Sequence, residues 1–193
     1  MKVVALLLAA GSATRFGSDK LLHLLPHDVQ IAVQSARHLK AVFGKDVLAI
    51  VRPDATALAE LLRKEGCEVV HCEHAADGMG ASLACAVRAA EGADAYVVAL
   101  ADMPFIRPSS IAAVRDELLK GAALAAPYFR ARRGHPVGIS SRFRDELARL
   151  QGDEGAKALL AHRSAEISKV PVGDPAVLRD IDTPGDLAPP LIV

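Results

Sequence analysis

The sequence predicts an α/β fold, a three-layer α/β/α sandwich on a mainly parallel sheet, and three observations lead to this fold class. Short apolar runs alternate along the chain with longer Ala- and Leu-rich stretches that have helical spacing. The apolar runs are continuous rather than alternating, as expected for strands that are buried on both faces of a sheet. A glycine follows the later helical stretches, at the position where many helices end. No internal repeat or linker breaks the pattern, so we expect a single domain over residues 1–193.

The expected elements follow one another as strand and helix. The first apolar run, 3–9, leads into a glycine-containing turn, and each later run is preceded by a stretch with helical spacing. The expected strands are 3–9, 46–51, 68–71, 95–100 and 122–126, and the expected helices are 29–42, 55–64, 82–90 and 109–120. The carboxyl ends of parallel strands meet at one edge of the sheet, where ligands bind. We therefore expect the site after Leu8, Val51, Leu100 and Ala126.

Composition and charge exclude several classes of function. Hydrophobic residues make up 51% and charged residues 24% of the chain, so it can bury a core and is not mainly disordered. Lys+Arg and Asp+Glu both total 23, and a balanced surface of this kind does not suit nucleic-acid binding. The longest apolar stretch, 3–10, is far shorter than the roughly 20 residues that span a bilayer. It also lacks the features of a signal peptide, so we expect a cytoplasmic protein without membrane partners.

The cysteines predict neither disulfides nor a metal site. Cys67, Cys72 and Cys85 are an odd number and too few for a disulfide framework. The segment 67–74 also carries two histidines and two glutamates, which is a composition typical of metal ligands. Alternation along a strand would place these donors on opposite faces, so we interpret the segment as a core strand with a polar end.

The turn after the first strand is the most informative segment. A glycine-containing turn that leaves a buried strand can direct several backbone N–H groups at one anion. Arg15 adds a planar fork suited to phosphate oxygens, and Lys20 adds a mobile point charge. The glycine spacing matches neither a Walker A loop nor a dinucleotide fingerprint. The segment predicts a phosphate-binding loop, and the alternative is a solvated turn.

The spacing L-A-A-G-x-x-x-R-x-G-x-x-K over residues 8–20 resembles the signature of the MobA-like nucleotidyltransferases. Within that family it is most similar to the molybdenum cofactor cytidylyltransferases. The resemblance implies a Rossmann-like nucleotidyltransferase fold, and it implies that this loop binds the triphosphate of an NTP. The residues to which it assigns nucleotide binding in the loop are Leu8, Ala9, Ala10, Gly11, Ser12, Arg15 and Lys20.

Further motifs follow in the family's order. D-G-M-G-A-S-L at 77–83 resembles a turn near the nucleobase, which implies nucleotide binding by Gly78 and Ser82, although Ser82 is equally suited to cap a helix. D-M-P at 102–104 is similar to the family motif whose aspartate binds magnesium, and D-I-D-T-P-x-D at 180–186 is similar to the motif with a second such aspartate. The resemblance thus implies Asp102 and Asp182 as metal ligands.

The acceptor site is also implied by the resemblance. G-H-P-V at 134–137 resembles a family segment near the acceptor, so Gly134, His135 and Pro136 are expected to bind it. A purely structural role for His135 is the alternative. The three arginines in 130–133 lie beside this segment and are either a solvated loop or a contact for an anionic acceptor. An NTP-binding part is then expected over about 1–105 and an acceptor-binding part over about 106–193.

These residues suit nucleotidyl transfer. We expect Asp102 and Asp182 to leave strand ends on the same side of the sheet and to share one Mg²⁺ that bridges the triphosphate. The phosphate of a pterin cofactor, with a second pKa of about 6, is mostly a dianion at pH 7 and needs no general base. Arg15, Lys20 and Asp102, the last through the metal, are the expected catalytic residues because they stabilise the transition state and the leaving pyrophosphate.

The leading hypothesis is an Mg²⁺-dependent cytidylyltransferase that moves CMP from CTP to a molybdopterin cofactor, whose product could pass to a molybdoenzyme or its chaperone. Ala10 resembles the cytidylyl branch, and its Cβ would narrow the base pocket. The alternatives are a GTP-dependent guanylyltransferase on the same acceptor, NTP transfer to another phosphorylated acceptor, and a non-catalytic nucleotide-binding module. A Rossmann dehydrogenase is disfavoured by the glycine spacing.

Overall fold

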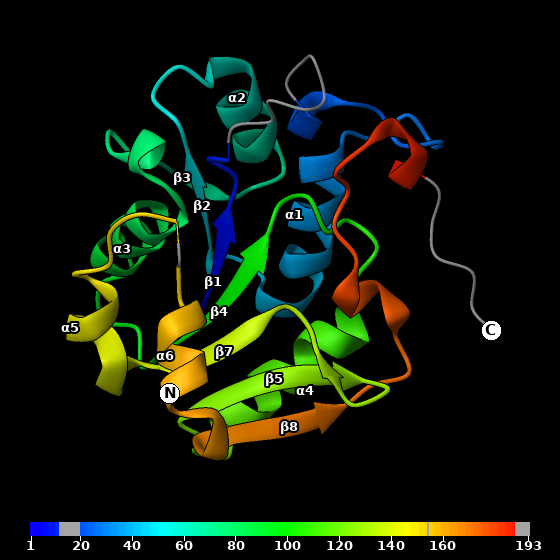
Figure 1. Cartoon of the computed structure of the whole chain (residues 1–193). Coiled ribbons are helices and arrows are strands. Elements are labelled where there is room, and N and C mark those ends of the chain that lie inside the picture. Colours follow the sequence, from blue (N-terminus) through cyan, green and yellow to red (C-terminus); the bar gives the residue numbers. More distant parts are fainter. Residues whose placement is uncertain (12–19, 154, 188–193) are drawn as a thin grey trace.

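The structure is a computed structural model, and it describes residues 1–11, 20–153 and 155–187. Its centre is an eight-stranded sheet in the order β3-β2-β1-β4-β7-β5-β6, with β8 also paired to β5 (Figure 1). Four of the strand pairs are parallel and three are antiparallel. The predicted fold class, α/β with a mainly parallel sheet, is confirmed.

The first half of the sheet is fully parallel. β1 (Val3–Leu8) lies between β2 (Val47–Val51) and β4 (Ala95–Leu100), and β3 (Glu68–His71) pairs with β2 at the edge. All six residues of β1 are buried, as its continuous apolar sequence predicts. β3 differs from the expected core strand, because two of its four residues are exposed and the other two are half-buried.

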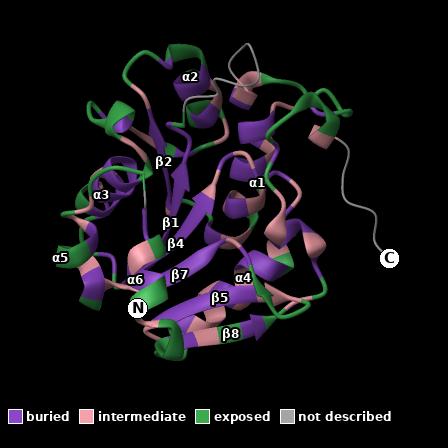
Figure 2. Cartoon of the chain, viewed as in Figure 1, coloured by how far each residue is buried: buried purple, intermediate pink, exposed green. Residues whose placement is uncertain are grey.

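Helices cover both faces of this sheet (Figure 2). The side chains of β1 alternate between two core clusters, so that Leu7 packs on one face and Leu6 on the other. α1 (Ile31–Phe43), α2 (Thr56–Lys64) and α4 (Pro108–Leu119) contribute to the first cluster. α3 (Met79–Ala89), α5 (Arg144–Leu147) and α6 (Lys157–His162) contribute to the second. The three predicted layers are therefore present.

The second half of the sheet is mixed. β7 (Val137–Ser140) runs antiparallel between β4 and β5 (Leu124–Phe129), while β8 (Ile167–Pro171) pairs with β5 in parallel. β6 (Arg132–Arg133) forms a hairpin with the end of β5. The two residues at the tip of this hairpin, Arg130 and Ala131, have positive φ angles of 47° and 64°. Twist-matched two-residue hairpin turns require this conformation, which glycine or asparagine usually adopts.

The third helix begins three residues before its expected start. Its N-cap is Gly78, whose φ of 117° is readily adopted only by glycine. Ser82 is therefore an interior helix residue, and the alternative that it caps the helix is wrong. No helix among the described residues is long and apolar enough to cross a membrane.

Candidate active site

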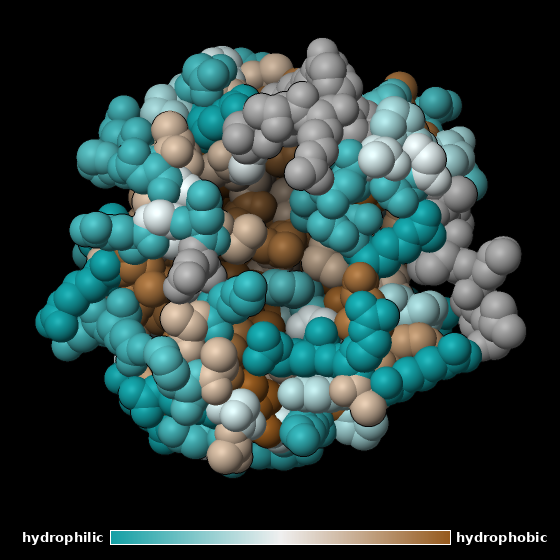
Figure 3. Space-filling view, viewed as in Figure 1, coloured by the Kyte–Doolittle hydropathy of each residue, from teal (hydrophilic) through white to brown (hydrophobic). Residues whose placement is uncertain are grey.

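A cavity of about 420 Å³ opens at the carboxyl ends of β1 and β4, where the sequence predicts the site. The last residues of these strands, Leu8 and Leu100, line it. Figure 3 shows apolar side chains inside a hollow near the middle of the molecule, with hydrophilic side chains around it. In the part of the chain that the structure describes, the charged residues that line the cavity are Lys20, Arg52, Asp102 and Asp153.

The turn after β1 contributes part of the predicted nucleotide site. Ala10 and Gly11 line the cavity together with Leu8. Ala9 does not: it is buried in the core cluster under α1, and its N–H donates to the carbonyl of Ile50 at 2.9 Å. Ala9 can therefore support the turn but offers no backbone donor to a phosphate. Ser12 and Arg15 lie outside the described residues.

The N-terminus of α3 forms the opposite wall. Gly78 and Ser82 both line the cavity, as the resemblance implies. The backbone here packs tightly against the segment before α6, because the N–H of Gly80 donates to the carbonyl of Gly152 at 2.7 Å. A Cβ on Gly80 would approach the Gln151 carbonyl oxygen to 2.6 Å, so only glycine fits this contact. The contact brings Asp153 to the edge of the cavity.

Three carboxylates gather beside the cavity. One oxygen from each of Asp102, Asp180 and Asp182 lies within 4.8 Å of the others. Asp102 follows β4 as predicted, but Asp182 does not leave a strand. It lies in the irregular segment between two 3-10 turns, Pro175–Leu178 and Pro184–Leu187. The structure thus brings Asp102 and Asp182 together as predicted, although Asp182 lies on an irregular segment and not at a strand end. It adds Asp180 to the pair.

A buried residue holds the two acidic segments together. The N–H of Ile181 donates to the carbonyl of Asp102 at 2.9 Å, and the Ile181 side chain is fully buried. Because Ile181 lies between Asp180 and Asp182, this bond places both of these carboxylates beside Asp102. The third aspartate of the motif, Asp186, accepts bonds from the backbone and side chain of Thr183 and shapes the turn instead.

Lys20 is the cation of this cluster. Its Nζ lies 2.9 Å from Asp102 Oδ2 and 3.4 Å from Asp182 Oδ1, and 12% of its side chain is exposed. Burial alone would lower the pKa of Lys20. The hydrogen bond to Asp102 and the charges of Asp102 and Asp182 outweigh that effect and raise its pKa. Lys20 is therefore charged at neutral pH and ion-paired, rather than directed into solvent.

The donor set suits a hard divalent cation. Carboxylate oxygens are the protein ligands that Mg²⁺ and similar ions take, typically one or two together with substrate phosphates. Asp102, Asp180 and Asp182 offer such oxygens within 4.8 Å of one another. Like charges at this spacing repel unless cations offset them. Among the described residues this is the cluster that could hold a metal; Cys67, Cys72 and the neighbouring histidines form none.

The predicted acceptor residues are less accessible than expected. Gly134 is buried against the backbone of Val177, and the N–H of His135 donates to the Val177 carbonyl at 2.8 Å. Pro136 is also buried. Burial of the His135 ring, and to a smaller extent the charge of Arg133, lower its pKa, so the imidazole is neutral at neutral pH. These residues do not line the cavity, and their role in acceptor binding stays a prediction.

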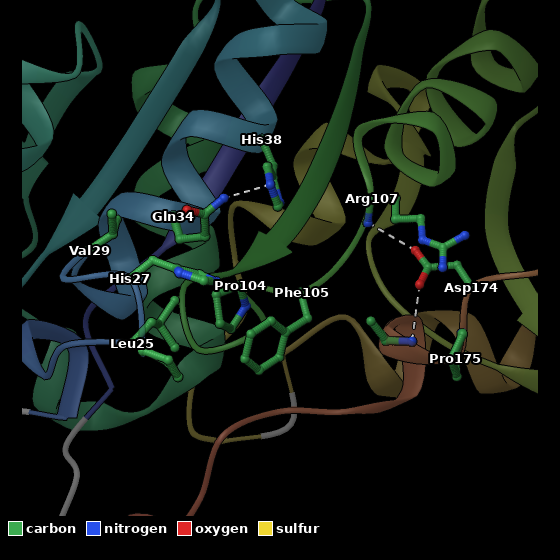
Figure 4. Close-up of a pocket in the computed structure, with 12 residues that line it drawn as sticks. Leu25, His27, Val29, Gln34, His38, Pro104, Phe105, Arg107, Asp174 and Pro175 are labelled. Atoms are coloured by element: carbon green, nitrogen blue, oxygen red, sulfur yellow. Dashed lines mark hydrogen bonds between the residues drawn. The ribbon is translucent and has the colours of Figure 1, made fainter. Parts of the chain in front are cut away.

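A second cavity of about 310 Å³ lies on the other side of the loop after β4 (Figure 4). Its walls are largely apolar and include Leu25 and Phe105. On one side Gln34 Nε2 and His38 Nε2 lie 2.6 Å apart, and burial lowers the pKa of His38. On the other side Asp174 accepts three hydrogen bonds, from Arg107 N, Ser110 Oγ and Ala176 N.

Sequence reasoning missed three residues of the site: Arg52, Asp153 and Asp180. Arg52 directly follows β2, a strand end at which the sequence did predict a site, so position alone could have found it. Asp180 belongs to the same motif as Asp182. Asp153 reaches the cavity through the contact between α3 and Gly152, which joins two segments that are far apart in the sequence.

Comparison with known proteins finds a family match and related structures. The model of the MobA-like NTP transferase domain family matches residues 5–167. The chain is 27% identical over 189 residues to a curated protein, nicotine blue oxidoreductase from Paenarthrobacter nicotinovorans, covering 94% of this chain and 92% of that protein. The crystal structure of Rv0371c from Mycobacterium tuberculosis H37Rv superposes with a TM-score of 0.82 at 26% identity, covering 96% of this chain and 94% of that one.

A second structure of Rv0371c, in complex with manganese, has a TM-score of 0.75 at 25% identity and covers 96% of each chain. The family match spans β1 through the first residue of β8, and so includes the cavity, Lys20 and Asp102. The motif with Asp180 and Asp182 lies beyond it and is contributed by the C-terminal segment. The chain belongs to the MobA-like NTP transferase family, and it is a nucleotidyltransferase.

Proposed function

We propose that the protein is a metal-dependent cytidylyltransferase that transfers CMP from CTP to the phosphate of a molybdopterin cofactor and releases pyrophosphate. The observation that carries the proposal is the cluster of Lys20 with Asp102, Asp180 and Asp182 at the side of the cavity. A lysine that can contact phosphate oxygens, next to carboxylates that can hold a metal ion, suits the binding of a triphosphate. Manganese in the related Rv0371c structure supports a divalent metal ion here, for which we propose Mg²⁺.

In the proposed reaction, an oxygen of the acceptor phosphate attacks the α-phosphorus of CTP. The new bond is a phosphoanhydride, and the bond between the α-phosphorus and the oxygen that bridges to the β-phosphate breaks, so pyrophosphate leaves. The acceptor phosphate is a dianion at pH 7, so no side chain has to remove a proton. This agrees with His135, whose buried neutral ring lies outside the cavity.

Each side chain then has an electrostatic task. Asp102, Asp180 and Asp182 would hold the metal ion, which when bound neutralises phosphate charge and orients the triphosphate. Lys20 lies near enough to the same point to contact phosphate oxygens that approach the carboxylates. Gly11, at the start of the predicted phosphate loop, is exposed, and no atom of the described residues lies within 4 Å of where its Cβ would stand, so a phosphate could approach its backbone closely. Arg15 remains the predicted second cation of this loop.

The choice of CTP rests on the size of the cavity near Ala10. Ala10 is buried and lines the cavity, so its Cβ reduces the space beside the turn. A pyrimidine base, which is smaller, would fit the reduced space with less steric overlap than a purine. Pocket shape of this kind supplies about 1–3 kcal/mol of discrimination. Ala10 is the residue on which our choice of CTP over GTP mainly depends.

We propose that the acceptor binds to the part of the site whose backbone Gly134, His135 and Pro136 support. Gly134 is buried and His135 is half-buried against Val177, so they would position the segment that leads to Asp180 rather than contact the acceptor directly. The exposed arginines of the β5–β6 hairpin suit an anionic acceptor. We place the reaction in the cytoplasm, and a molybdoenzyme or its chaperone is the proposed recipient of the product.

The test is an assay of pyrophosphate release. The purified protein is incubated with Mg²⁺, molybdopterin and either CTP or GTP, and the nucleotide product is identified by mass spectrometry. We expect turnover that requires the acceptor and is faster with CTP. Turnover with GTP but not with CTP would reject the proposed base. Release of pyrophosphate only with another phosphorylated acceptor would reject the pterin as the acceptor.

One relative is named as an oxidoreductase, so the same preparation is also assayed for oxidation of NADH and NADPH with a quinone-like dye. We expect no dye-dependent oxidation. Dye-dependent oxidation without pyrophosphate release from any NTP would replace the proposed transfer by a hydride-transfer reaction.

A further inference from the structure

Lys20 bridges the same two carboxylates that are expected to hold the metal. Its Nζ is 2.9 Å from Asp102 Oδ2 and 3.4 Å from Asp182 Oδ1. A divalent cation bound by the same two oxygens, Asp102 Oδ2 and Asp182 Oδ1, would stand at the same bridging point, since its bonds to oxygen are about 2.0–2.1 Å long. The ammonium group and the cation therefore cannot both occupy it.

The bridging position is well defined by the fold. Asp102 is tied to the segment of Asp182 through the Ile181 N–H, and the Lys20 side chain is 12% exposed. Lys20 itself begins a 3-10 turn, Lys20–Leu22, whose Leu21 is buried in the core. The ion pair thus joins three chain segments, and it is more shielded than an ordinary surface pair.

No other described cation is paired with these aspartates. The nearby Arg179 is engaged with Asp186 instead, with 3.8 Å between its Nη2 and the Asp186 Oδ1. Asp180 forms no ion pair with any described residue. Among the described residues, Lys20 therefore carries the positive charge that offsets Asp102 and Asp182.

We propose that Lys20 is an internal counter-ion that competes with free divalent cations for Asp102 and Asp182 and yields its place when a triphosphate binds. This rests on the proposed function in one respect only, namely that the triphosphate receives the displaced ammonium group. The competition has two consequences. The free protein binds metal alone weakly, and metal together with the triphosphate binds strongly, because phosphate oxygens attract both cations.

The proposal predicts that removing Lys20 changes metal affinity in opposite directions with and without nucleotide. Lys20→Met keeps the aliphatic chain and removes the charge, so it should bind free Mn²⁺ about tenfold more tightly than the wild type. With CTP present, the same variant should bind the Mn²⁺–nucleotide complex more weakly than the wild type, because the phosphates lose a contact. A residue that only binds phosphate would show the second effect without the first.

The measurement is Mn²⁺ binding followed by electron paramagnetic resonance of the free ion, with and without CTP. Lys45→Met is the matched control, because Lys45 is exposed and precedes β2, at the opposite edge of the sheet. It removes the same charge and should leave Mn²⁺ affinity unchanged. Lys20→Arg retains a cation and should bind free Mn²⁺ as weakly as the wild type.

Two further readouts connect the effect to the aspartates. Adding Asp102→Asn to the Lys20→Met variant should cancel the gain in Mn²⁺ affinity. Without metal, Lys20→Met should have a lower Tm than the wild type, and Mg²⁺ should raise its Tm by more than it raises that of the wild type. Equal or weaker binding of free Mn²⁺ by Lys20→Met, or an equal gain in Lys45→Met, would overturn the proposal.

The result is independent of the proposed activity. If no NTP and acceptor pair gives turnover while Lys20→Met still binds free Mn²⁺ more tightly, the proposed function fails and the competition stands. If turnover is found and the affinity for free Mn²⁺ does not rise, the competition fails and the function stands. A gain in affinity that persists with CTP would reject the transfer of Lys20 to the triphosphate.

Discussion

The two cavities beside the loop after β4 hold their aspartates in different ways. Asp102 faces the larger cavity and has Lys20 as its side-chain partner. Asp174, beside the smaller cavity, is buried, and both of its oxygens accept bonds from the fold itself. A carboxylate whose oxygens are all used by the fold has a structural role, whereas one held by a single ammonium group can exchange that partner for a ligand. The comparison therefore indicates a ligand-binding role for Asp102 and a structural role for Asp174.

The surroundings of Asp102 are charged, whereas those of Asp174 are mostly apolar. Around Asp102 the lining of the cavity also includes the charged side chains of Arg52 and Asp153. Around Asp174 the walls are mostly apolar, and His38 is neutral because burial lowers its pKa. Asp174 bonds to the backbone at the start of α4, where the positive end of the helix dipole further offsets its charge.

The largest effect is expected for Asp102→Asn. A neutral amide is a poor ligand for a hard cation, so turnover should fall by about 10²–10³, as for the loss of one strong electrostatic contact in a transition state. Its free energy of unfolding should change by less than about 0.5 kcal/mol, because Lys20 keeps Asp182 as a partner. Steady-state rates and urea denaturation measure the two quantities. Wild-type dependence of the rate on Mg²⁺ would remove Asp102 from the metal site.

Asp174→Asn should show the reverse pattern. The amide nitrogen of Asn would face a backbone or hydroxyl donor, which leaves a buried donor unpaired and costs about 1–3 kcal/mol. We expect a Tm lower by several degrees and turnover at low temperature within about threefold of the wild type. Ser110→Ala, which removes one of the three bonds, should cost less and serves as the graded control. A loss of turnover as large as that of Asp102→Asn, at unchanged Tm, would contradict the structural role.

A smaller effect is expected at the base-binding end of the larger cavity. Ala10→Gly removes the Cβ that narrows the turn, so the ratio of kcat/KM for CTP to that for GTP should fall from at least tenfold to nearer unity. The two ratios are compared on the same protein preparation. An unchanged ratio would mean that Ala10 does not select the base, and a wild-type ratio near one would reject CTP specificity.

The smallest effect is a change in the pH dependence of stability. Burial lowers the pKa of His38, against a weaker opposing effect of the Ile106 backbone and the charge of Asp174. Below the ordinary histidine pKa of about 6.5 the unfolded chain binds more protons than the folded one, so stability falls as the pH decreases. His38→Gln should therefore lose less stability than the wild type between pH 7.5 and pH 5. An identical slope in urea denaturation would show that His38 does not titrate differently on folding.

Much of the fold follows from local sequence patterns. The strands β1 to β5 and the helices α1 to α4 lie where apolar periodicity predicts them, with ends displaced by at most a few residues. β6, β7 and β8 escaped prediction because their stability comes from partners rather than from local propensity. β6 has two residues, and β7 (VGIS) and β8 (ISKVP) contain no continuous apolar run that would mark a buried strand.

The site was predictable in part for the same reason. Asp102 follows a long apolar strand, so its place at the active edge could be inferred from the sequence. Asp180 and Asp182 lie on an irregular segment, where no periodicity tells which side chains share a side. The bond from the Ile181 N–H to the Asp102 carbonyl ties this segment to Asp102 and helps to set that direction. The ion pair of Lys20 likewise depends on three separate segments meeting.

The Ile181 bond also orders events during synthesis. The ribosome completes β1, α3 and β4, with the cavity walls they carry, long before it reaches Ile181. A nascent chain that has folded this far holds Asp102 but not Asp180 or Asp182. It could bind a nucleotide, yet it lacks the carboxylates that would complete a metal centre. Under the proposed function, turnover would therefore begin only once the C-terminal segment has docked against Asp102.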